Sequence, residues 1–307
     1  MIIDTDAGVD DAQAIMLALT TPGVTVEAIT TVTGNVHVSK VVPNVCLVLD
    51  VMKKDVPVYR GADRPLLDDR WFPEEGFHGT DGLGDWKDRP LTSRQPESEH
   101  AVQALLRLAD QHPRELTLVA LGPLTNLALA ARLDPSFPSK IKRFVFMGGT
   151  IAAVGNTPIV TAEWNIYCDP EAAWITLHAF PEATMLSWET TLHHPLNWQH
   201  FDSLIALGSE VSRFFANISA SNVQYNKETR PWRGYLIPDP LAMAITLQPE
   251  LVRKVEPHFV TVELNGSRTR GQTVIDYQGT LGRQPNVRVV TELDINGVYE
   301  LFRRALA

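Results

Sequence analysis

Short apolar runs alternate along the chain with segments in which apolar residues recur at helical spacing. The apolar pair Ile2-Ile3 begins a strand, and in the segment that follows Ile15, Met16 and Leu19 share one helical face. Strands that alternate with helices form βαβ units, so the pattern predicts a mostly parallel sheet with helices on both faces. The predicted strands span residues 2–3, 24–32, 116–121 and 143–147, and the predicted helices span residues 12–20, 40–52 and 124–132.

The last fifty residues have a different pattern. Two β-prone runs, 259–264 and 273–276, flank the turn-forming pair at 265–266 and predict a β-hairpin. A strand at 287–291 and a closing helix at about 297–306 follow the hairpin. The fold class that we expect is therefore α/β, with a C-terminal β-hairpin extension.

One long stretch, residues 66–96, is rich in Pro, Gly, Trp and Asp and has little periodicity. A structureless stretch of that length inside a compact domain is typically a functional loop or lid. Neither an internal repeat nor a linker divides the chain, so we expect one domain over residues 1–307.

Charge and cysteine content narrow the classes of protein. The chain has 27 Lys and Arg against 36 Asp and Glu, a net charge of −9, which argues against nucleic acid as the main partner. The two cysteines, Cys46 and Cys168, cannot form a disulfide framework and favour a reducing compartment. The sequence has no apolar run of membrane-spanning length and no targeting segment, so we expect a cytoplasmic protein without a membrane partner.

Four carboxylates fall within eight residues at the end of the first predicted strand: Asp4, Asp6, Asp10 and Asp11. Ligands of open α/β sheets bind at that edge. Carboxylates packed this closely raise each other's pKa values unless a cation compensates, and oxygen ligands suit Ca²⁺ or Mg²⁺ better than zinc. Asp10 or Asp11 alone could instead cap the following helix, but capping leaves Asp4 and Asp6 unexplained.

Two known acidic motifs do not fit this cluster. An EF-hand loop that began at Asp4 would need a carboxylate at its twelfth position, which is Ile15. A phosphotransferase of the haloacid dehalogenase type would need Thr or Val at position 8, which is Gly8. The cluster is therefore predicted to be a metal or polyol site of another kind.

Segments distant in sequence could complete the site. Residues 122–126 and 147–149 each end a predicted strand, and as ordinary turns they would need no further role. Glu163 and Asn165 would share one face if the backbone is extended, and a carboxylate beside amides suits a sugar diol. His78, among glycines and acids in the possible lid, is a candidate proton donor.

Two Asp-Pro pairs indicate helix starts. Asp169 and Asp239 are each followed by a proline and then by an apolar helical segment. Proline favours the first helical position, so we expect both aspartates to be N-cap residues. Asp169 is given no further role.

These segments together resemble the inosine-uridine preferring nucleoside hydrolases, and the resemblance covers essentially the whole chain. The motifs that carry it occur in the order Asp4-Thr-Asp-Ala-Gly-Val-Asp-Asp11, Gly34-Asn35, His78-Gly-Thr-Asp-Gly-Leu-Gly84, Gly122-Pro-Leu-Thr-Asn126, Met147-Gly-Gly149, Ala162-Glu-Trp-Asn165 and Asp239-Pro-Leu-Ala242. The resemblance implies a Rossmann-like sheet, hydrolysis of the N-glycosidic bond of ribonucleosides, and a homodimer or homotetramer.

The resemblance also implies roles for individual residues. Asp6 would be the general base, and Asp4 would support the site from behind. A Ca²⁺ ion would be held by Asp6, Asp11, Asp239 and the main-chain carbonyl of Leu121. The residues that would bind the nucleoside are Asp10, Asn35, Met147, Asn156, Glu163, Trp164, Asn165 and Asp239.

The chain departs from the family pattern at Pro238, where many members have a histidine that protonates the leaving base. Proline cannot donate a proton. Acid catalysis would then depend on His78, or on Tyr225, Lys227 or Trp232. Two alternatives to a nucleoside hydrolase stay open: a hydrolase of a modified N-riboside with a good leaving group, and a non-catalytic nucleoside- or ribose-binding protein.

Overall fold

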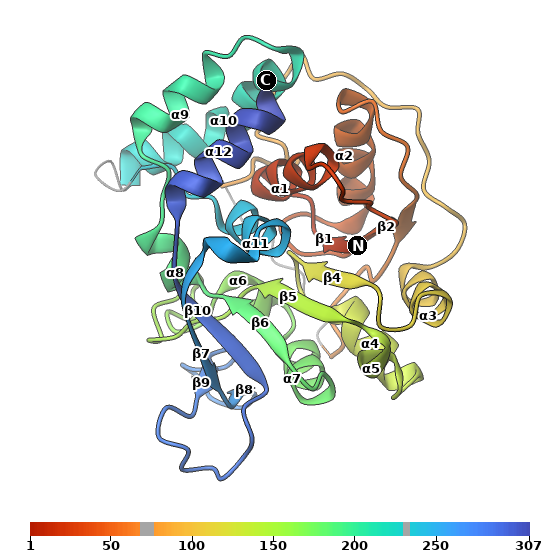
Figure 1. Ribbon diagram of the computed structural model, residues 1–307, viewed down its shortest axis with the longest axis vertical. Coiled ribbons are helices and arrows are strands. Elements are labelled where there is room, and N and C mark those ends of the chain that lie inside the picture. Colours follow the sequence, from red (N-terminus) through yellow and green to blue (C-terminus); the bar gives the residue numbers. More distant parts are fainter. Residues whose placement is uncertain (68–76, 230–233) are drawn as a thin grey trace.

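The computed structural model describes residues 1–67, 77–229 and 234–307 (Figure 1). Its centre is an eight-stranded sheet in the order β3-β2-β1-β4-β5-β6-β10-β7, in which only β7 is antiparallel to its neighbour. The strands are β1 Ile2–Thr5, β2 Ala28–Thr31, β3 Val58–Arg60, β4 Thr117–Ala120, β5 Arg143–Met147, β6 Ala183–Leu186, β7 Val252–His258 and β10 Val287–Leu293. The mostly parallel α/β sheet predicted from the sequence is confirmed.

The first six strands have the order 3-2-1-4-5-6 of a Rossmann sheet. The chain runs from β1 outward to β3 and then returns to β4 on the other side of β1. A crevice forms beyond the carboxyl ends of the strands where the direction reverses. The acidic segment that follows β1 therefore lies at the topological switch point.

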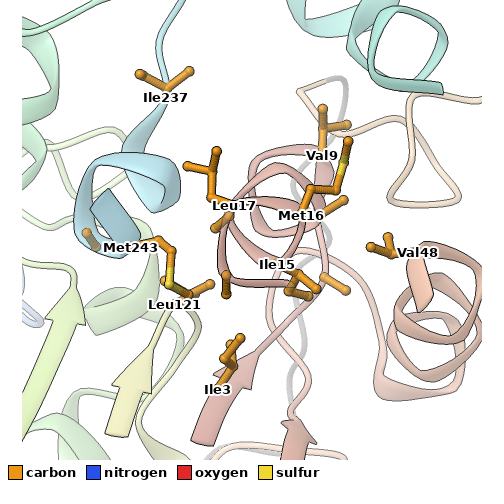
Figure 2. Close-up of a cluster of buried hydrophobic side chains, with 14 of the residues drawn as sticks. Ile3, Val9, Ile15, Met16, Leu17, Val48, Leu121, Ile237 and Met243 are labelled. Atoms are coloured by element: carbon orange, nitrogen blue, oxygen red, sulfur yellow. The ribbon is translucent and has the colours of Figure 1, made fainter. Parts of the chain in front are cut away.

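Two layers of helices cover the sheet, and β1 shows why. Ile3 packs in the cluster that includes α1, α2 and α11, whereas Ile2 packs in the cluster that includes α3, α4 and α7. Because side chains alternate along a strand, each of the two faces receives an apolar row. Figure 2 shows α1 between Ile3, Met243 of α11 and Val48 of α2.

The four helices predicted by residue range correspond to α1, α2, α4 and α12 to within three residues at each end. The bounds are α1 Val9–Thr20, α2 Val38–Val51, α3 Ala101–Gln111, α4 Thr125–Leu133, α5 Phe137–Lys140, α6 Trp164–Cys168, α7 Pro170–Ala179, α8 Trp188–His193, α9 Trp198–Ile205, α10 Glu210–Thr229, α11 Pro238–Leu247 and α12 Ile295–Leu306, with a 3₁₀ turn at Pro249–Leu251.

The predicted C-terminal hairpin is confirmed: β8 (Val260–Val262) pairs antiparallel with β9 (Thr273–Ile275). The predicted strand at 24–32 is too long, because only β2 is extended within it. Ala28 pairs with Ile2, so the residues before it lie beyond the first residue of β1 and have no strand to pair with on that side.

Within residues 66–96, positions 68–76 lie outside the described residues, and the part that the structure describes contains neither a helix nor a strand. Cys46 is a buried free thiol. None of the described helices has the length and apolar character needed to cross a membrane.

Candidate active site

A pocket opens at the switch point, and residues far apart in sequence line it. All eight predicted substrate residues contribute, together with His78 and Leu121. The full lining is Asp10, Asn35, Phe77, His78, Leu121, Met147, Asn156, Glu163, Trp164, Asn165, Trp188, Tyr225, Leu236, Pro238 and Asp239. The structure therefore brings together in one cavity the segments that sequence analysis treated separately.

Buried carboxylates lie at this pocket. Asp10, Asp11 and Asp239 each place one oxygen within 4.8 Å of the others, and all three side chains are buried. Burial, with the charges of Asp10, Asp11 and Asp6, raises the pKa of Asp239 well above its usual range. Burial and the charge of Asp11 do the same for the pKa of Asp6. Such a cluster is stable in its charged form only with a compensating cation.

The donor set fits a hard cation. Every group in the cluster offers oxygen, as Ca²⁺ and Mg²⁺ prefer. Oδ1 of Asp6 is buried and has no hydrogen-bond partner among the described residues. Leu121 lines the pocket, and its main-chain oxygen accepts a 2.6 Å hydrogen bond from the Asn165 amide. The three-carboxylate cluster thus contains Asp11 and Asp239, which the resemblance assigns to the metal, and Asp10, which it assigns to the sugar alone, whereas Asp6 is not one of the three.

Asp11 also caps α1, so the capping interpretation is confirmed for this residue. It is the third residue of the helix, and its Oδ2 accepts from the N–H of Gly8 at 2.8 Å. The Thr5 hydroxyl donates to the other oxygen at 2.5 Å, and the Asn35 amide donates to Oδ2 at 3.2 Å. Three donors thus fix the carboxylate before any ligand arrives.

Asp6 lies in a slot between two glycines. A Cβ at Gly34 would stand 2.1 Å from Oδ2 of Asp6, and a Cβ at Gly122 would stand 2.9 Å from its Cγ. The main-chain N–H of Asn35 donates to the same Oδ2 at 2.7 Å. Glycine at these two positions is therefore what lets strands β2 and β4 close around Asp6.

Gly34→Ala is expected to reduce turnover at least about 100-fold, because the new methyl group overlaps Oδ2 of Asp6 at 2.1 Å and, less severely, Cδ of Pro123 at 2.7 Å. Steady-state kinetics and thermal unfolding check this together. Gly23→Ala is the control for a destabilising loss of glycine away from the pocket: a Cβ there meets nothing within 4 Å, but φ is +78, so Tm is expected to fall while turnover stays unchanged. Turnover near the wild-type value in Gly34→Ala would show that the position of Asp6 does not matter.

Asp4 does not line the pocket, in keeping with a supporting position. Its Oδ2 accepts from the Thr30 hydroxyl at 2.6 Å and from the Asn126 amide at 2.8 Å. Burial raises the pKa of Asp4 to about 7. Through these bonds Asp4 joins β1, β2 and the first turn of α4 directly behind the cluster.

His78 reaches the pocket from the long loop. Its Nδ1 accepts from the N–H of Val9 at 3.1 Å and lies 3.6 Å from Oδ1 of Asp10. Because Nδ1 acts as acceptor, the neutral ring carries its proton on Nε2. A Cβ at Gly8 would meet Nδ1 of His78 at 2.5 Å, so glycine is needed for this approach.

Two predictions of local structure are wrong. Helix α11 begins at Pro238 with Ile237 as N-cap, so Asp239 is the second helical residue and not a cap. Glu163 itself has an extended backbone, but it is the N-cap of α6, so Asn165 is helical and the two residues do not form the extended segment that we expected. The Glu163 side chain instead accepts from the N–H of Asn165 at 2.9 Å. Its Oε2 also accepts from the N–H of Gly149. The predicted cap at Asp169 is confirmed.

Sequence reasoning missed three apolar lining residues, Phe77, Trp188 and Leu236. Trp188 follows the carboxyl end of β6. Because ligands bind beyond the carboxyl ends of parallel strands, a prediction of β6 would have identified Trp188 as a candidate. Of the alternative acids, Tyr225 lines the pocket, but Lys227 lies over the Trp198 ring at 5.0 Å. Trp232 lies outside the described residues.

A Rossmann-like sheet with an acidic, amide-rich pocket at its switch point defines an α/β enzyme with a site for a hydroxyl-rich ligand. Residues 1–300 match the family model of the inosine-uridine preferring nucleoside hydrolases, and the chain belongs to this family. Its homologues are ribonucleoside hydrolases, and nucleoside hydrolase activity follows for this chain.

Individual relatives differ in the base that their names specify. The chain is 35% identical to the pyrimidine-specific ribonucleoside hydrolase RihA of Citrobacter koseri, over 100% of this chain and 97% of the relative. It resembles the solved inosine-guanosine nucleoside hydrolase with a TM-score of 0.92 and 36% identity, over 99% and 97% of the two chains. A purine-preferring ribonucleoside hydrolase from Gardnerella vaginalis matches with a TM-score of 0.91 and 29% identity over the same shares.

Proposed function

We propose that the protein is a Ca²⁺-dependent hydrolase that splits ribonucleosides into ribose and free base. The observation that carries the proposal is the buried carboxylate cluster, which faces a pocket lined by amides and a further carboxylate. Asp6, Asp11, Asp239 and the Leu121 carbonyl would hold the ion. When bound, Ca²⁺ neutralises the cluster and makes a coordinated water more acidic.

The side chains supply the remaining chemistry. Asp6, fixed by the N–H of Asn35, accepts the proton of the attacking water. Loss of the base leaves positive charge on the ribose ring, and the carboxylates of Asp10 and Asp239 stabilise that charge. A water held by the cluster and a sugar held by the lining residues would meet at one face of the ring.

Ribose hydroxyls both donate and accept, and the pocket offers partners of both kinds. Oδ1 of Asn156 is a buried acceptor with no hydrogen-bond partner among the described residues. The carboxylate of Asp10 accepts, whereas the amide of Asn35 can both donate and accept. The full ribose-binding set that we propose is Asp10, Asn35, Met147, Asn156, Glu163, Trp164, Asn165 and Asp239.

The leaving base meets a different set of groups. Pro238 lines the pocket and offers no proton, so we assign the proton donor to the imidazolium form of His78, which becomes the neutral ring once its proton has passed to the leaving base. Phe77 and Tyr225 lie beside it, with Phe77 edge-on to His78 at a centroid distance of 4.7 Å. Pro238 also favours a second candidate function, hydrolysis of a modified N-riboside whose leaving group needs no acid.

Ribose release from inosine, adenosine, guanosine, uridine and cytidine is expected with Ca²⁺ and is expected to stop after chelation. Nitrophenyl riboside is included in the same panel because its leaving group needs no acid, so it distinguishes the second candidate function from the first. Turnover of that riboside alone would favour a modified natural substrate, and Ca²⁺-dependent binding without any ribose release would indicate a binding protein. The homodimer or homotetramer remains a prediction from the resemblance, and the cytoplasmic location remains a prediction from the sequence.

A further inference from the structure

Glu189 is a buried carboxylate that the proposed reaction does not use. It lies in the first turn of α8, one residue after the pocket residue Trp188. Its Oε2 accepts from the N–H of Ile151 at 2.8 Å. Its Oε1 accepts from the N–H groups of Ala152 at 2.8 Å and Val154 at 3.1 Å. Three main-chain N–H groups of one loop therefore donate to a single side chain.

The loop is bent to make this possible. Ala153, between the last two donors, has φ +57, a left-handed conformation that non-glycine residues rarely adopt. A left-handed residue in a turn lets successive N–H groups point at one anion. A residue keeps such a strained conformation only when its surroundings hold it there. The hydrogen bonds from Ala152 and Val154 to the Glu189 carboxylate hold the backbone on both sides of Ala153.

The C-terminal hairpin holds the opposite side of the same loop. The Thr273 hydroxyl, on β9, accepts from the N–H of Thr150 at 2.7 Å and contacts the Thr150 carbonyl oxygen at 2.5 Å. The Tyr277 hydroxyl donates to the carbonyl of Ile151 at 2.6 Å. The loop backbone is thus bonded from two elements that are remote in sequence.

This loop leads directly to Asn156. Gly155 and Asn156 donate to the carbonyls of Val160 and Ala162, which closes the turn. A Cβ at Gly155 would stand 2.1 Å from the Ala162 oxygen, so the turn has no spare room. Asn156 lines the pocket, and its buried Oδ1 has no hydrogen-bond partner among the described residues. Because the chain between Val154 and Asn156 is only one residue long, the loop's position sets that of the amide.

We propose that Glu189 is a positioning residue, which places Asn156 for sugar binding by holding the 150–154 loop through three backbone N–H groups. The proposal rests on the proposed function in so far as Asn156 binds the ribose. It assigns Glu189 no contact with the substrate. Its effect is therefore expected in KM and only through Asn156.

The test is a double-mutant cycle between Glu189→Ala and Asn156→Ala. Loss of one sugar hydrogen bond is expected to raise KM about tenfold in Asn156→Ala, with a smaller change in kcat. Glu189→Ala is expected to raise KM by a similar factor, and the double variant is expected to be no worse than Asn156→Ala alone. An unchanged KM in Glu189→Ala, or additive effects in the cycle, would overturn the proposal.

Two further variants cover the case in which Glu189→Ala does not fold. Glu189→Gln keeps one acceptor oxygen and is expected to have a KM between wild type and Glu189→Ala. Tyr277→Phe removes only the bond to the Ile151 carbonyl from a half-exposed ring and is expected to raise KM a few-fold. Wild-type KM in both variants would contradict the proposal.

A matched control separates positioning from general stability. Asp294 caps α12 by accepting from the N–H groups of Asn296 and Gly297. Asp294→Ala is expected to lower Tm without moving KM. Hydrogen exchange gives a readout independent of activity: the amides of Ile151, Ala152 and Val154 should lose protection in Glu189→Ala. Absence of nucleoside hydrolysis by the wild-type protein would contradict the proposed function. Unchanged protection of these three amides in Glu189→Ala would contradict the role of Glu189, whatever the activity.

Discussion

Asp6→Asn is expected to lower kcat at least about 10³-fold, because the variant keeps the shape of the side chain but loses the base and one cation ligand. The amide oxygen of the new side chain can still accept from the N–H of Asn35, so the local fold is expected to persist. Removing one of several buried like charges is also expected to leave Tm of the chelated protein unchanged or higher.

Ribose release under saturating substrate and Ca²⁺ measures the effect, and calorimetric titration with Ca²⁺ measures the loss of metal affinity. The control is Asp276→Asn, which changes a carboxylate that accepts only from the N–H groups of Thr280 and Leu281 in an exposed turn. Near-wild-type kcat in Asp6→Asn would rule out Asp6 as the base.

His78→Asn is expected to reduce hydrolysis of natural nucleosides by about 10²- to 10⁴-fold, the usual range for a lost general acid. Asparagine can keep an acceptor for the N–H of Val9 but has no titratable proton. Nitrophenyl riboside needs no protonation of its leaving group, so its turnover is expected to fall far less. The selectivity between the two substrates is the quantity to measure.

Tyr225→Phe is the companion variant, since Tyr225 is the other described lining residue with an acidic proton that sequence analysis singled out. An equal loss on both substrates in His78→Asn would mean that His78 holds Asp10 and Val9 in place rather than donating a proton. A substrate-selective loss in Tyr225→Phe instead would transfer the role to Tyr225.

The sequence predicts elements well where apolar periodicity is unambiguous. The strand at 143–147 matches β5 at both ends. The strand at 24–32 does not, since strand length depends on the partner, and β1 begins only at Ile2 opposite Ala28. Pairing of this kind between distant segments has no trace in local periodicity.

The meeting of the site residues was predictable, but the way in which they are held was not. Parallel strands end at one edge, so the segments after β1, β4 and β5 had to meet there. Glu163 caps α6, a short helix that no Pro or Asp signal indicated. Asp239 lies inside α11 because that helix begins at Pro238, two residues before the proline that the Asp-Pro pattern suggested as its first residue. Apolar wall residues such as Leu236 carry no chemical signal in the sequence.

The glycines around the carboxylate cluster also set limits on how this enzyme can change. Gly8, Gly34 and Gly122 leave no volume for side chains beside Asp6 and His78, so almost any substitution at that end of the pocket disturbs the reacting groups. The apolar and aromatic lining residues Phe77, Trp188, Tyr225 and Leu236 are not among the nearest atoms that a Cβ at a described glycine would meet. A library for altered base selectivity therefore belongs at these four positions, where substrate range can vary while the carboxylates that carry the hydrolysis are left unchanged.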